Sequence, residues 1–200
     1  MKSFAPTRRW FAPAVLALTG AAIVNADTIA TFSDPSPNGS QPLFAFTSAG
    51  ANGSLSGSWS STGLLLETPG LAAPDFPDAR FVMQPVTATG GPVLWTLGPG
   101  RISLQNSAGV EQMFISFAGG VLTTPVGFGG SDFVGNNVLF GGNIIPGGLS
   151  QEAFAFSFAN PVGTPENYTV TAAFTSSAIP EPASMVLMFI GGVFALRRRS

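Results

Sequence analysis

Neither cysteine nor histidine occurs among the 200 residues of the sequence. Without cysteine no disulfide can stabilise the fold, so its stability has to come from a buried core. The two absences also exclude a Ser-His-Asp triad, a cysteine nucleophile and an ordinary zinc site, because these need an imidazole or a thiolate. We therefore predict a protein that is not an enzyme and holds none of the common cofactors.

Charged residues are also scarce, at 9% of the chain, and lysine occurs only at position 2. Between residues 27 and 179, two arginines are outnumbered by nine carboxylates, which gives this part a net charge of −7. Nucleic-acid binding requires clustered cations that contact the phosphates. The sequence therefore argues against nucleic acid as a partner.

Residues 1–26 have the three parts of a secretory signal peptide. Basic residues come first, an apolar run extends from Trp10 to Val24, and the small residue Ala26 ends the segment. This pattern predicts an apolar helix that is cleaved between Ala26 and Asp27, and it predicts that the chain is exported. An uncleaved signal anchor is the alternative.

The last 21 residues join a Pro-Glu-Pro tripeptide (Pro180, Glu181, Pro182) to an apolar run and an arginine cluster (Arg197, Arg198, Arg199). The apolar run, Ala183 to Leu196, has 14 residues and would rise ~21 Å as a helix, less than the ~30 Å of a bilayer core. It predicts a short transmembrane helix. The arginines resist translocation, so the body of the chain is expected outside the cytoplasm.

In this order and position, the three parts resemble the PEP-CTERM sorting signal of exported proteins in Gram-negative bacteria, which often make exopolysaccharide. The resemblance implies that exosortase, a membrane transpeptidase, recognises Pro180, Glu181 and Pro182. It also implies that Ala183 to Leu196 is the membrane segment and that the arginines form the cytoplasmic stop. Exosortase, the secretion machinery and the membrane are then the expected partners. A plain tail anchor is the alternative.

The sequence of residues 27–179 predicts one all-β domain. Phe154, Phe156 and Phe158 alternate with small residues, and a second alternating run from Tyr168 to Phe174 predicts its hairpin partner. Further strands are expected at Thr28–Phe32, Leu43–Thr47, Ser54–Ser60, Leu64–Glu67, Phe81–Ala88, Val93–Leu97, Arg101–Gln105, Gln112–Phe117 and Val138–Phe140. Many short strands separated by turn residues predict an antiparallel sandwich or jelly roll.

Two segments do not show this pattern of short alternating strands. Residues 48–63 are rich in Ser, Gly, Ala and Asn, which predicts a polar strand or a long surface loop. Residues 127–148 carry many glycines and are expected to run over the surface.

Aromatic residues suggest a glycan site. Trp59 is flanked by serines and is the expected exposed platform, whereas Trp95 sits in an apolar run and is expected in the core. Tyr168 is expected to pack inward with its hydroxyl at the rim.

Carboxylates provide the remaining candidates. A glycosidase needs two acids across a cleft, and the acids available for such a pair are Asp75, Asp78, Glu111, Asp132 and Glu152. Ca²⁺ accepts carboxylate ligands, so Asp75, Asp78 and Asp132 are weak calcium candidates. Turns that use Asp for local hydrogen bonds are the simpler reading.

Together these observations predict an exported, non-catalytic protein of the cell surface or extracellular matrix. The resemblance of the tail implies an association with exopolysaccharide. A carbohydrate-binding module is the alternative, followed by the carboxylate glycosidase.

Overall fold

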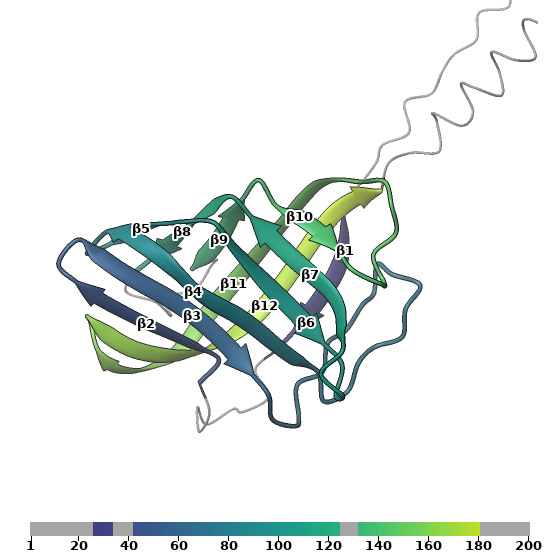
Figure 1. The fold of residues 1–200 in the computed structure, drawn as a ribbon, viewed down its shortest axis with the longest axis horizontal. Helices are drawn as coiled ribbons and strands as arrows, with labels where there is room; N and C mark the ends of the chain where they lie inside the picture. The colour runs from purple at the N-terminus through teal and green to yellow at the C-terminus, as the bar shows by residue number, and fades with distance from the viewer. Residues whose placement is uncertain (1–25, 34–41, 125–131, 181–200) are drawn as a thin grey trace, which may run out of the picture.

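Strands with one buried face build the structure, a computed structural model that describes residues 26–33, 42–124 and 132–180 (Figure 1). No helix occurs in these ranges. The described residues form twelve strands: β1 (Asp27–Phe32), β2 (Phe44–Ala49), β3 (Asn52–Trp59), β4 (Arg80–Gly90), β5 (Leu94–Leu97), β6 (Gly100–Gln105), β7 (Glu111–Phe117), β8 (Gly119–Thr123), β9 (Phe133–Asn136), β10 (Leu139–Gly141), β11 (Leu149–Thr164) and β12 (Asn167–Pro180).

Eight of these strands close into an antiparallel barrel. They follow the order β4-β3-β2-β12-β11-β9-β8-β5, and β5 pairs again with β4 through Ala88 and Leu97. The prediction of an all-β fold is confirmed, but the predicted sandwich is replaced by a closed ring. The closure depends on β5, β8 and β9, which are short strands in glycine-rich sequence. They connect β4 to β11 and so complete the ring.

The other four strands extend the wall at one end of the barrel. β6 pairs with the first residues of β4, and β7 and β10 continue outward from it. β1 pairs with the last residues of β12, with Asp27 opposite Ala178. At this end, β4 and β12 each pair with a strand that is not part of the closed ring.

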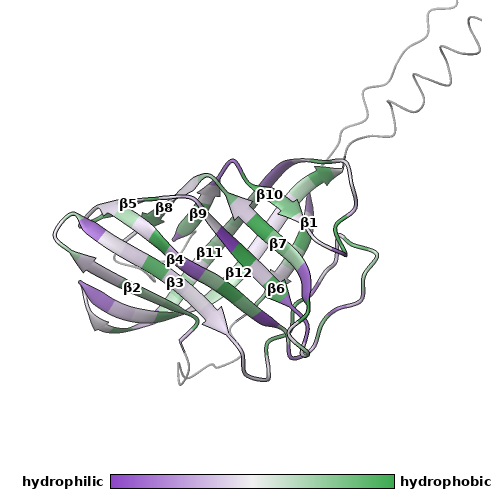
Figure 2. Cartoon of the chain, in the orientation of Figure 1, coloured by the Kyte–Doolittle hydropathy of each residue, from purple (hydrophilic) through white to green (hydrophobic). Residues whose placement is uncertain are grey.

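Inward-facing phenylalanines fill the core, and Phe156 lies among them with no exposed surface. Its ring centroid is 4.9 Å from that of Phe44, 5.0 Å from that of Phe174 and 5.7 Å from that of Phe133. Buried and more exposed residues alternate along the strands, and Figure 2 shows bands of apolar and polar residues along them. The predicted hairpin of β11 and β12 is confirmed, with Phe156 opposite Phe174.

Glycines inside the strands provide room for phenylalanine rings of the neighbouring strand. A Cβ on Gly57 would lie 2.5 Å from the ring of Phe44 directly opposite, and a Cβ on Gly135 would lie 2.2 Å from the ring of Phe154. Glycine in a strand interior often marks such a close approach. These glycines are therefore part of the packing of the wall.

Most predicted strands are present, but some segments differ from the prediction. Leu64–Glu67 makes only isolated bridges, Thr31 to Glu67 and Leu66 to Phe76. Residues 48–63 contain the polar strand β3. The expectation of a surface segment at 127–148 is wrong for its described part, because β9 and β10 lie there and Phe133 is fully buried.

The barrel has two unlike ends. One end, which we call the mouth, is formed by the β2–β3, β4–β5 and β11–β12 turns. At the opposite end, which we call the terminal pole, β1 begins at Asp27 and β12 ends at Pro180 (Figure 1). Because β12 has 14 residues, the two ends are on the order of 40 Å apart along this strand.

Candidate functional site

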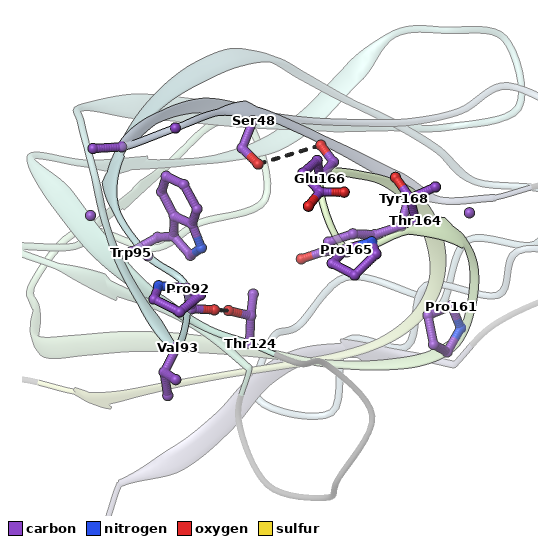
Figure 3. Close-up of a pocket in the computed structure, with 15 residues that line it drawn as sticks. Ser48, Pro92, Val93, Trp95, Thr124, Pro161, Thr164, Pro165, Glu166 and Tyr168 are labelled. Atoms are coloured by element: carbon purple, nitrogen blue, oxygen red, sulfur yellow. Dashed lines mark hydrogen bonds between the residues drawn. The ribbon is translucent and has the colours of Figure 1, made fainter.

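The mouth holds a pocket of about 850 Å³, drawn in Figure 3. Three turns surround it, at residues 48–51, 90–93 and 161–166, and Thr124 at the end of β8 completes the rim. Small-molecule sites typically have volumes of ~300–1,000 Å³ and often occupy the mouths of barrels. The size and place of this pocket therefore fit a small ligand or one or two residues of a polymer.

The β4–β5 turn forms one side of the pocket because glycine lets it approach Trp95. Gly91 has a φ of 83°, and a Cβ on it would lie 2.5 Å from the Trp95 ring. Trp95 is 4% exposed, which confirms the prediction that it packs in the core. Figure 3 shows Trp95 on one side of the pocket and Pro165 with Tyr168 on the other.

The polar groups of the mouth are largely occupied. Ser48 donates its hydroxyl to the backbone oxygen of Glu166 at 3.4 Å, and Thr124 donates to the backbone oxygen of Pro92. Among the described residues that line the pocket, Glu166 carries the one carboxylate, and none is a lysine or arginine. The pocket therefore favours a neutral or cationic ligand over an anionic one.

Tyr168 lies beneath the rim. The prediction that it packs inward is confirmed, since it is 8% exposed and its ring centroid is 5.2 Å from that of Phe46. The expectation of a hydroxyl at the rim is wrong, because that oxygen is buried and has no hydrogen-bond partner. Burial, and then the charge of Asp132, raises the pKa of Tyr168 well above its usual range. The hydroxyl therefore stays protonated.

Trp59 is not an exposed platform. Its side chain is 5% exposed, and its Nε1 is buried without a hydrogen-bond partner. The reason is the period of two along β3, which places Trp59 on the same inward face as Leu55 and Gly57. That spacing was present in the sequence, but the surrounding serines obscured it.

Each candidate acid accepts a hydrogen bond within the fold. The Asp75 carboxylate accepts from the backbone N–H of Thr68 at 2.8 Å, and that of Asp78 accepts from Gly63 at 2.7 Å. These two bonds join residues that are seven and fifteen positions apart, so they tie the loop at 75–78 to the preceding segment. The reading of local turns stays a prediction.

Two further carboxylates connect strands. Asp132 accepts from the backbone N–H of Phe158 at 2.7 Å, and Glu152 accepts from that of Phe140 at 3.0 Å. Among the described residues, no three His, Cys, Asp or Glu side chains lie together so that they could hold a metal ion. Calcium binding at the loop of Asp75 and Asp78 and, separately, at Asp132 stays a prediction.

Glu111 belongs to a surface ion pair on the extra strands. Arg101 donates to one carboxylate oxygen at 2.7 Å, and the Ser103 hydroxyl donates to the other at 2.6 Å. The hydrogen bond from Arg101 is the largest cause that lowers the pKa of Glu111. The Arg101 guanidinium also lies 4.2 Å from the centroid of the Phe114 ring. This group stabilises the β6–β7 pair rather than the mouth.

At the terminal pole, the two ends of the described domain lie on neighbouring strands. Asp27, the first residue after the predicted signal-peptide cleavage site, pairs with Ala178. Two residues later, Pro180 pairs with Leu149 of β11. Residues 178–199 match the family model of the PEP-CTERM protein-sorting motif. The chain carries a PEP-CTERM sorting motif. The match supports an exported protein that exosortase processes at the membrane.

The PEP-CTERM motif begins inside the barrel wall, because its first three matched residues are the last three of β12. Its remaining parts lie outside the described residues, namely Glu181, Pro182, the apolar run from Ala183 to Leu196 and the three arginines. Of the predicted signal peptide, residues 1–26, all but Ala26 also lie outside them. No helix in the described part of the chain is long and apolar enough to cross a membrane.

No curated protein and no solved structure matches the chain.

Proposed function

We propose that this protein is a non-catalytic protein of the cell surface or extracellular matrix, presented with the mouth of its barrel directed away from the membrane and associated with exopolysaccharide. The observation that carries the proposal is the position of the sorting motif. The motif starts at the terminal pole, whereas the pocket lies at the other end of β12. A chain attached or processed through its C-terminus therefore leaves the mouth free to contact the surroundings.

The natural absence of cysteine makes this proposal directly testable. In an Ala51→Cys variant, the added thiol lies on the exposed rim of the mouth and is the single reactive thiol of the chain. A large maleimide reagent that does not cross membranes is added to intact cells of the native host, and the medium and matrix are analysed in parallel. We expect labelling on intact cells or in the matrix fraction, while the unmodified chain gives no signal. Labelling that requires cell lysis would contradict the proposal.

A second candidate function is a carbohydrate-binding module that uses the mouth in place of Trp59. The pocket has exposed proline faces at Pro92, Pro161 and Pro165, together with the Glu166 carboxylate and hydroxyl oxygens that can still accept a hydrogen bond. It has no cation among its described lining residues, and the body has a net charge of −7. A neutral glycan therefore fits better than one rich in uronic acid or phosphate.

Affinity electrophoresis separates the two glycan classes. We expect gels containing dextran, a neutral polymer, to retard the protein more than gels containing alginate, which is anionic. The variant Ala51→Trp places an indole in the exposed part of the pocket and should abolish the retardation. The matched control is Ala108→Trp, which adds the same ring at an exposed turn remote from the mouth. Equal migration of both variants and the unmodified chain in dextran would remove this candidate.

A further inference from the structure

The start of the PEP-CTERM motif is held by hydrogen-bonded pairing with two strands. Ala178 is fully buried and lies opposite Asp27 of β1. On the other side of β12, Ile179 lies opposite Ser150, and the Ser150 hydroxyl donates to the Ile179 backbone oxygen at 3.3 Å. Pro180 is the last residue of β12 and lies opposite Leu149. No spacer therefore separates the folded barrel from the motif.

This pairing conflicts with recognition of the motif by an enzyme. An enzyme that binds an extended peptide uses its backbone N–H and C=O groups, as a strand added to a sheet does. Ala178 pairs with β1 and is buried in the barrel, and Ile179 and Pro180 pair with β11, where Pro180 has no N–H to offer. Local opening of the end of β12 is thus required before the whole matched segment becomes available.

An irregularity in β11 limits how far that opening must extend. The register shifts between Ser150 and Ala153, and Gln151 within the shift has a φ of 51°, in the left-handed region. Non-glycine residues adopt this conformation at an energetic cost. The two pairs made by Leu149 and Ser150 are therefore separated from the regular ladder that carries Phe154 and Phe156. They can open while the phenylalanine core stays intact.

We propose that residues 178–180, with their partners on β1 and β11, form a clamp on the sorting motif, and that release of this clamp sets the rate at which exosortase processes the folded protein. The proposal rests on the exosortase sorting that the motif supports. The terminal pole is then an element that couples the folded state of the barrel to its sorting.

Pulse-chase labelling in the native host measures the conversion of precursor to processed product, with intact mass identifying the product. Ser150→Ala removes the hydroxyl that donates to Ile179, and we expect processing roughly two- to tenfold faster. The matched control is Ser48→Ala, which removes a serine hydroxyl that donates to the backbone oxygen of Glu166 at the mouth, the opposite end of β12. The control should be processed at the rate of the unmodified chain.

Gln151→Gly tests the clamp in the opposite direction. Glycine adopts a positive φ without a clash, so the pairing of Leu149 and Ser150 becomes more stable. We expect processing roughly fivefold slower than in the unmodified chain. Faster processing of this variant, or an unchanged rate, would contradict the clamp.

An insertion after Ala178 moves Ile179, Pro180 and the rest of the motif away from their partners on β11. Four residues, Gly-Ser-Gly-Ser, placed after Ala178 should give the fastest processing, and Ser150→Ala should have no further effect in this background. The same four residues placed after Ala108 are the control. Equal rates for the unmodified chain, Ser150→Ala and the insertion after Ala178 would overturn the clamp and leave exosortase sorting intact. Absence of any processed product from every version, including the unmodified chain, would overturn the sorting itself.

Discussion

Replacing Phe156 by alanine should destabilise the barrel more than any comparable change on its outer face. The ring is fully buried and contacts rings from both halves of the wall. Its removal takes away the burial of a large apolar side chain and leaves a cavity bounded by other rings, which relax incompletely. Phenylalanine-to-alanine changes in cores typically cost about 3–5 kcal/mol. Domains of this kind have free energies of unfolding of about 5–15 kcal/mol, so the change removes a large part of the total.

The matched control is Phe114→Ala. Phe114 is on β7, is partly exposed and carries the Arg101 guanidinium over its ring. Its loss should lower the free energy of unfolding by about 1 kcal/mol, since an exposed cation–π contact contributes about 0.5–1 kcal/mol. Urea unfolding followed by tryptophan fluorescence measures both variants, because Trp59 and Trp95 are buried in the folded barrel. A loss below about 1.5 kcal/mol for Phe156→Ala, or equal losses for the two variants, would refute this account of the core.

Three further predictions follow from single contacts. Tyr168→Phe removes a buried hydroxyl that has no partner, so urea unfolding should show a change within about 1 kcal/mol and not the larger loss expected when a bonded group is deleted. Gly91→Ala should destabilise the barrel by about 1–3 kcal/mol, because the added Cβ would meet the Trp95 ring and the φ of Gly91 is positive. The control in the same assay is Gly147→Ala, where no atom lies within 4 Å of the added Cβ. Glu111→Gln should lower the free energy of unfolding by at most about 1 kcal/mol at neutral pH. The pKa of Glu111 is lowered in the folded state, so the difference between the variant and the unmodified chain should be complete above the ordinary pKa of 4.5. Unfolding at a series of pH values should show this difference being lost as the pH falls through the folded pKa.

The sequence predicted those strands whose inward face is marked by large apolar residues. The period of two around Phe154, Phe156 and Phe158 identified β11 correctly, and the short separation from Tyr168 identified its hairpin partner. Both pieces of information are local, which is why they could be read without a structure.

Closure of the barrel could not be read in this way. It depends on pairing between β5, β8 and β9, short strands in which Gly119, Gly120 and Gly135 interrupt the apolar pattern. The apolar group at Gly135 is supplied by the ring of Phe154 from the next strand. At Gly57 the apolar group is likewise supplied by a neighbouring strand, through the ring of Phe44. The glycine therefore made β3 resemble a polar tract, which led to the wrong prediction that Trp59 is exposed.

The mouth was missed because its residues come from three turns that are far apart in the sequence. Gly90, Gly91 and Pro92 are residues typical of a turn, but nothing in the sequence shows which other turns lie beside this one. The sorting motif, in contrast, was found because its parts are contiguous and are recognised in linear order.

The meeting of Asp27 and Ala178 on adjacent strands also has a consequence for engineering the orientation of the barrel. A short linker could join the two ends, and the chain could then be opened in the β2–β3 turn at Gly50, where an added Cβ has no neighbour within 4 Å. Such a circular permutant would keep every strand pair of the barrel but would begin and end at the mouth. With a membrane signal attached there, the terminal pole would be turned toward the surroundings. Under the proposed orientation, the direction in which the barrel faces would then depend on where its chain is interrupted and not on the fold.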